Sequence, residues 1–109
     1  MVSWGIEKVT EMHNKLNERY NTNIKLEFIN GFYAWGQFIP NENPWKIIIR
    51  KDNYMKGGTL MHEWSHAIEW MQSGHTNHEA MPFFKIQKKL MDEFHIKYNN
   101  EFWQNIPNE

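Results

Sequence analysis

One pentapeptide constrains this chain more than any other stretch: His62-Glu63-Trp64-Ser65-His66, an H-E-x-x-H motif. In a helix, side chains four residues apart lie on the same face, so His62 and His66 can present two imidazoles to one ion. Glu63 lies about 100° round the helix from His62, beside such an ion but not bound to it. Because a catalytic zinc ion usually takes three protein ligands and one water, the motif predicts a zinc site with Glu63 as general base.

The residues around the motif predict that it lies in a helix. Apolar side chains recur at helical spacing on the face opposite the histidines, at Leu60, Trp64, Ala67, Ile68 and Met71. We expect Gly57-Gly58 to break the chain before this helix and Thr59 to cap its first turn. Ser73-Gly74 is the expected end of the helix.

A third protein ligand is needed to complete such a site. Glu69 is on the same helical face as His66, one turn on, and is better placed to support a ligand than to bind the ion. His75 and His78 lie in the loop that follows, and Glu79 just precedes the next helix. The residues alone leave His75, His78 and Glu79 open as the third ligand.

Composition limits the class of protein. The chain has 109 residues, 16% of them aromatic, and we expect a single domain over residues 1–109. It has no cysteine, which excludes disulfides and thiolate metal sites. No apolar run is long enough for a membrane helix and no secretory signal is evident, so we expect a soluble cytoplasmic protein.

The rest of the sequence predicts an α+β fold. An amphipathic pattern indicates a helix over residues 3–20, capped by Ser3, and alternation at 24–28 indicates a strand. Asn30-Gly31 is a hairpin signal, and strands are expected at 32–39 and 45–51, giving a three-stranded antiparallel-type meander. Pro82 is expected at the first position of a final helix that runs to about residue 98.

A family resemblance adds to this interpretation. The segment from Gly57 to His66, then His78, then Met81-Pro82-Phe83-Phe84-Lys85, resembles the SprT-like zinc metalloproteases, a family that includes Spartan. The resemblance covers positions 3 to 98 and implies a zincin-like fold, with His62, His66 and His78 holding one Zn²⁺ per chain and Glu63 as catalytic base. The glycine that follows the third histidine in the family is Glu79 here, and the family's cysteine-built zinc ribbon is absent.

The predicted function is that of a zinc-dependent metalloendopeptidase, a monomer that hydrolyses peptide bonds of a protein or peptide substrate. The alternative is a non-proteolytic zincin-fold module for binding or regulation, with a structural zinc. A structural site has no need of a carboxylate at Glu63, so this residue favours catalysis. The balanced charge, −1 at pH 7, argues against nucleic acid as the main partner. Lys85, Lys88 and Lys89 form a small basic stripe; solvation is its default explanation, and a DNA contact is the alternative.

Further roles are predicted around the site. His75 is the first candidate to stabilise the oxyanion, with Tyr33 and Tyr54 as alternatives. Glu69 and Asn77 are candidates to hydrogen-bond the ligand histidines. An extended substrate is expected to add as a strand to an exposed sheet edge at 45–51.

Overall fold

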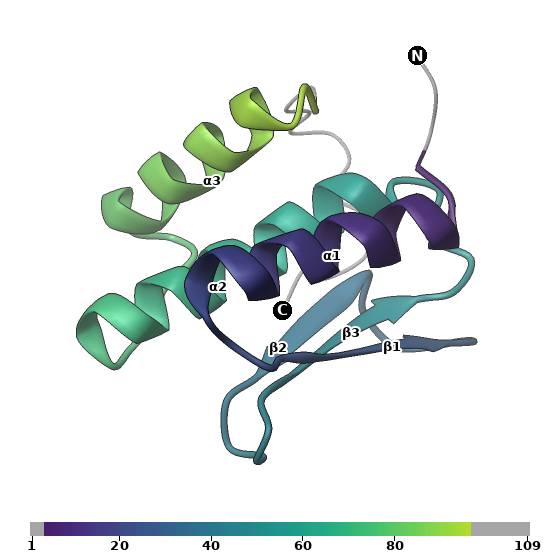
Figure 1. Ribbon diagram of the computed structural model, residues 1–109, viewed down its shortest axis with the longest axis horizontal. Coiled ribbons are helices and arrows are strands. Elements are labelled where there is room, and N and C mark those ends of the chain that lie inside the picture. The colour runs from purple at the N-terminus through teal and green to yellow at the C-terminus, as the bar shows by residue number, and fades with distance from the viewer. Residues whose placement is uncertain (1–3, 97–109) are drawn as a thin grey trace.

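The computed structural model describes residues 4–96 (Figure 1). Its elements are, in chain order, α1 (Ile6–Tyr20), β1 (Lys25–Ile29), β2 (Gly36–Ile39), β3 (Lys46–Arg50), α2 (Lys56–Ser73) and α3 (Met81–Glu93). The α+β class is therefore confirmed for this part of the chain. None of its helices is both long and apolar enough to cross a membrane.

The sheet is mixed, and the predicted antiparallel meander is wrong. The strand order is β1-β3-β2, with β1 parallel and β2 antiparallel to β3. The run Ile47-Ile48-Ile49 is buried along its whole length, so β3 takes the centre of the sheet. The turn at Asn30-Gly31 forms, with Gly31 at φ 66°, but the chain then passes to the far side of β3 and makes no hairpin.

The free edge beside the helices is therefore β2, and the expected edge at 45–51 is wrong. β2 starts only at Gly36, and among the described residues it pairs only with β3. The Arg50 amide donates to the Trp35 carbonyl at 2.9 Å, which makes this a hydrogen-bonded pair. Because such pairs alternate along antiparallel strands, the backbone N–H and C=O groups of Gly36 and Phe38 point away from β3.

Helix α2 lies at the centre of the molecule. It packs with α1 over one face of the sheet, while α3 covers the side of α2 that faces away from the strands (Figure 1). The thirteen residues from Gly57 to Glu69 are all buried, as expected for a helix enclosed on all sides. The predicted end is confirmed, with Gly74 in the left-handed region at φ 72°.

The predicted start of α2 is wrong. The helix begins at Lys56, so Gly57 and Gly58 lie inside it. The Thr59 hydroxyl does not cap the helix but accepts a hydrogen bond from Asn53 Nδ2 at 2.7 Å. Asn53 is fully buried, and its Oδ1 accepts from the Met55 amide at 2.7 Å. This asparagine fixes the turn that leads into α2.

The other two helices begin or end at different residues from those expected. α1 begins at Ile6 with Gly5 at its N-cap, and the predicted cap Ser3 lies outside the described residues. α3 begins at Met81, so Pro82 is the second residue of the helix and not, as was expected, the first. α3 ends at Glu93, and residues 97–98 of the expected helix lie outside the described residues. A bidentate ion pair between Arg19 and Glu93 joins the C-terminal ends of α1 and α3.

His13 ties α1 to α2 and to the start of the sheet. Trp64 Nε1 donates to His13 Nδ1 at 3.0 Å, so Nε2 carries the ring proton and donates to the Ile24 carbonyl at 2.7 Å. This histidine is only 2% exposed. Burial lowers the pKa of His13, although its hydrogen bond to Ile24 partly offsets this effect.

The two glycines inside α2 are expected to respond oppositely to alanine. A Cβ at Gly57 would lie 2.8 Å from Trp4 Cδ2, whereas one at Gly58 would meet only Ile96 Cγ2, at 3.8 Å. Gly57→Ala should lower the free energy of unfolding by about 1–3 kcal/mol because it displaces the Trp4 ring. Gly58→Ala should raise it by about 0.5–1 kcal/mol through helix propensity. Urea unfolding of both variants tests this, and equal shifts would contradict the packing.

His13 should make stability depend on pH. Its pKa in the folded protein lies below the ordinary 6.5, so between these two values the unfolded chain binds more protons. Stability is therefore fully present above about pH 6.5 and is lost as the pH falls towards the folded pKa, by at most about 1.4 kcal/mol per pH unit. Unfolding of the metal-free wild type and His13→Gln between pH 8 and 5 should show a shallower decline in the variant. Parallel curves would mean that His13 does not titrate as stated.

Candidate metal centre

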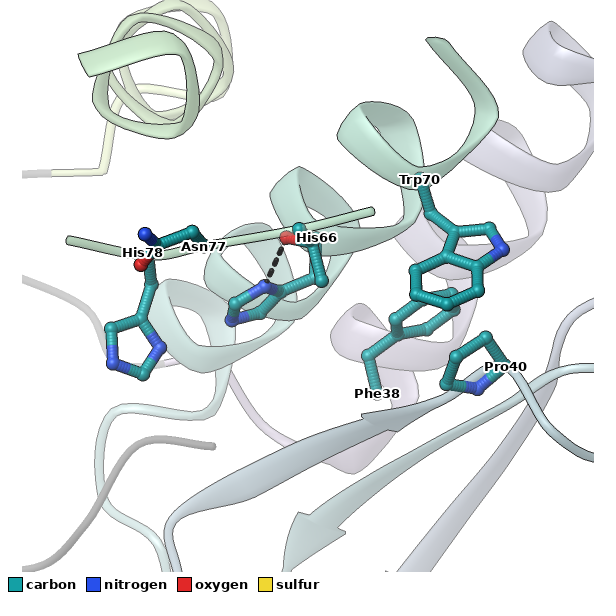
Figure 2. A pocket seen from close by; sticks show the side chains of 7 residues that line it. Phe38, Pro40, His66, Trp70, Asn77 and His78 are labelled. Carbon is teal, nitrogen blue, oxygen red and sulfur yellow. Dashed lines mark hydrogen bonds between the residues drawn. The ribbon is translucent and has the colours of Figure 1, made fainter. Parts of the chain in front are cut away.

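Three imidazoles converge beside α2. His62 and His66 come from α2 and His78 from the loop that leads to α3; their ring centroids are 5.0, 5.8 and 5.4 Å apart. One nitrogen of each ring lies within 4.8 Å of the corresponding nitrogens of the other two. Figure 2 shows the rings of His66 and His78 on the same side of the cavity that they line. The arrangement can hold a metal ion.

The third histidine of the cluster is His78. Within residues 4–96, no other group of histidine, cysteine and carboxylate side chains is close enough together to hold an ion. His75 and Glu79 are both exposed and do not belong to the cluster. The loop geometry therefore separates three candidates that the sequence alone left open.

His62 is oriented by Gln87 from α3. His62 Nδ1 lies 2.6 Å from Gln87 Oε1, and because an amide oxygen only accepts, the proton is on Nδ1. This leaves the lone pair on Nε2 for an ion. Gln87 is itself only 3% exposed. Such a partner fixes both the tautomer and the orientation of a ligand histidine.

His66 also has a hydrogen-bond partner at Nδ1, here a hydroxyl that can donate or accept. Its Nδ1 lies 2.7 Å from the Thr76 hydroxyl, a contact drawn as the dashed line in Figure 2. Its Nε2 is buried and has no hydrogen-bond partner among the described residues. A buried polar atom without a partner is costly, and a metal ion would satisfy this one. The residues present therefore fit a bound ion.

The cluster is backed by an apolar floor. The ring of Phe83 is fully buried, with its centroid 5.0 Å from that of His62, 4.5 Å from that of His66 and 6.2 Å from that of His78. Burial lowers the pKa of His62 to about 4 and that of His66 to about 3. Both rings are therefore neutral near pH 7, as a metal ligand must be.

Glu63 lies between α2 and the edge strand. Its side chain is fully buried, and a Cβ built on Gly36 would lie 3.1 Å from Glu63 Oε2. The same Cβ would collide with Thr59, so only glycine fits at this position of β2. This close backbone approach brings β2 next to the carboxylate.

His62 and His66 do not have the predicted partners, Glu69 and Asn77. Glu69 Oε1 accepts a hydrogen bond from the Asn77 amide at 2.9 Å, so these two residues contact each other and anchor the loop just before His78. Gln87 is instead the partner of His62, and Thr76 is the partner of His66. The only sequence signal for Gln87 is its position, as a polar residue, on the apolar side of α3.

The residues predicted to stabilise an oxyanion or to contact DNA do not line the cavity beside the imidazoles. Tyr33 is 57% exposed and Tyr54 64% exposed, and His75 is also exposed. None of the three lines the cavity beside the imidazoles, so their role at an oxyanion stays a prediction. Lys85, Lys88 and Lys89 are exposed on α3, where Lys88 pairs with Asp92 at 2.8 Å. The DNA contact likewise stays a prediction.

Comparison with known proteins found no matching family model, no matching curated protein and no matching solved structure.

Gln87 should tune the metal affinity of this centre. Gln87→Leu removes the acceptor from His62 Nδ1 and should weaken zinc binding by about 10–100-fold. Gln87→Glu keeps an acceptor at the same reach and should retain the affinity. Competition with a chromophoric chelator measures both, and thermal unfolding of the metal-free variants controls for the fold. Equal affinity of the leucine variant and the wild type would show that Gln87 does not act through His62.

Proposed function

We propose that this chain is a zinc-dependent metalloendopeptidase with a zincin-like fold, of the SprT-like type. The observation that carries the proposal is the convergence of three imidazoles beside a helix that also carries a buried carboxylate, Glu63. The resemblance of the motif and of the segment around Pro82 to that family adds support.

Zinc is the metal that the donor set favours. Three imidazoles, with no thiolate and no carboxylate in the cluster, suit a borderline ion in a tetrahedral site that keeps one position open. His62, His66 and His78 would hold it. When bound, zinc supplies Lewis acidity, which polarises a carbonyl and lowers the pKa of a bound water to about 7.

Glu63 would carry the proton. Its carboxylate takes a proton from the attacking water as general base and then donates it to the leaving amine as the peptide bond breaks. The close approach of Gly36 places this group directly against β2, the strand at the edge of the sheet. A purely structural site would not need a carboxylate there.

The substrate would bind as an added strand on β2. The outward backbone groups of Gly36 and Phe38 offer hydrogen bonds to an extended peptide, which is the usual way in which a free sheet edge captures one. Gly36 is also the residue whose position lies against Glu63. A peptide paired there would pass its backbone close to the carboxylate. We infer a peptide or unfolded protein segment as the substrate.

Metal content and proteolysis together test this function. Wild type should bind one zinc ion per chain by elemental analysis and cleave casein. Glu63→Gln should keep the zinc but lose at least about 100-fold in cleavage rate, because only the general base is removed. His78→Ala should lose the zinc, whereas His75→Ala should keep it.

Two results would contradict the proposed peptidase function. Zinc bound tightly with no cleavage that depends on Glu63 would favour the binding or regulatory module with a structural zinc. No zinc in the wild type, after purification without chelator and addition of zinc, would rule out both functions.

A further inference from the structure

A cavity of about 330 Å³ opens beside the candidate metal centre (Figure 2). His66, His78, Thr76 and Asn77 form one side of it, and Phe38, Pro40 and Trp70 form the other. Two of the three clustered imidazoles therefore face the same space as an apolar wall. The volume is near the lower end of the range for small-ligand sites, and it suits a single side chain.

The apolar wall is built into the fold. His62, His66 and Trp70 follow one another at steps of four residues, so the helical face that presents the imidazoles also presents the indole. The Phe38 ring meets the Trp70 ring edge-on with centroids 6.4 Å apart. On its other side, Phe38 meets Trp45 at 5.7 Å and 89°. A wall braced in this way keeps its shape when the cavity is empty.

None of the seven residues that line the cavity is Asp, Glu, Lys or Arg. A charged side chain that entered would lose water without gaining an oppositely charged partner among these seven residues, which is unfavourable. An aromatic or long aliphatic side chain would instead bury apolar surface against Trp70 and Phe38. The lining of the cavity therefore favours uncharged, apolar side chains over charged ones.

The cavity is continuous with the edge on which we place the substrate. Phe38 directs its backbone groups outward along β2 and its side chain into the cavity. A peptide residue that pairs opposite Phe38 presents its own side chain on the same face of the sheet. That side chain meets the space between Trp70 and the imidazoles.

We propose that this cavity is a recognition pocket for one uncharged, apolar side chain of the substrate, close to the bond that is cut. This assignment rests on the proposed peptidase function, and it names the class of peptide that the enzyme prefers. Trp70 and Phe38 are the residues that set the preference.

Cleavage profiling tests the proposal first. Zinc-loaded protein is incubated with a mixture of sequence-diverse peptides, and the cut sites are identified by mass spectrometry. At one fixed position relative to the cut, Phe, Leu and Met should exceed Asp and Lys by at least about 10-fold, the size of a hydrophobic-pocket preference. Trp70→Ala should reduce this ratio to near one. Phe32→Ala removes an aromatic ring outside the cavity and should leave the ratio unchanged.

A variant that gains a new side-chain preference is a useful control, because damage to the fold would not create one. Asn77 Oδ1 accepts a hydrogen bond from the Glu79 amide at 3.0 Å, and Asn77→Asp keeps that acceptor while adding a negative charge to the lining. This variant should accept Lys and Arg at the selected position at least about 10-fold better than wild type does. No change in its profile would contradict the assignment of Asn77 to the pocket wall.

A binding measurement separates failure of the pocket from failure of the peptidase. The indole N–H resonance of Trp70, assigned with Trp70→Phe, is followed by NMR in zinc-loaded protein during titration with N-acetyl-phenylalanine amide or N-acetyl-aspartic acid amide. A saturable shift with the first compound only supports the pocket, even if no peptide is cleaved. Cleavage without a positional preference, combined with no such shift, overturns the pocket but leaves the peptidase. No cleavage and no shift overturn both.

Discussion

The burial of α2 on every side is the constraint on which the rest of the structure depends. A helix with thirteen consecutive buried residues needs a sheet, α1 and α3 to cover it, and each of these partners also contributes to the candidate site. The sheet brings Gly36 against Glu63, and α3 brings Gln87 and Phe83 against the histidines. In a protein of this size the candidate metal centre and the hydrophobic core occupy the same space. The apolar surroundings also keep His62 and His66 neutral, because a charged imidazole there would lose its hydration.

A few buried polar side chains set the positions of the loops. Asn53, His13, Glu69 and Gln87 are each at most 3% exposed, and each joins segments that are distant in the chain or fixes a turn. Asn53 holds the entry to α2, and Glu69 holds the loop that carries His78. Because an unsatisfied polar group in such a core costs about 1–3 kcal/mol, these contacts disfavour any other arrangement of the loops. Order at the candidate site thus arises from hydrogen bonds made around the imidazoles as well as from packing beneath them.

The parts that could be predicted from the sequence are those governed by local rules. The spacing of His62 and His66 determines their common face in any helix, and Gly74 marks where that helix ends. The sheet was predicted wrongly because the local turn signal at Asn30-Gly31 favoured a hairpin. The pairing actually depends on which strand can be buried on both faces, and that is the isoleucine strand β3. Gln87 and Thr76 were missed for a related reason. A hydrogen bond over 25 residues, such as that from His62 to Gln87, leaves no periodic trace in the sequence.

The docking of α3 has a consequence for any ion held by the three histidines. α3 packs on α2, is tied to α1 through Arg19 and Glu93, and supplies both the partner of His62 and the floor under all three rings. A chain in which α3 has come away offers a centre whose first histidine is no longer oriented and whose floor is missing. An ion held there would therefore bind best to the chain with α3 docked, and its binding free energy would also stabilise the docked position of α3. Metal binding and the docking of α3 onto α2 would therefore be thermodynamically linked, so that each favours the other.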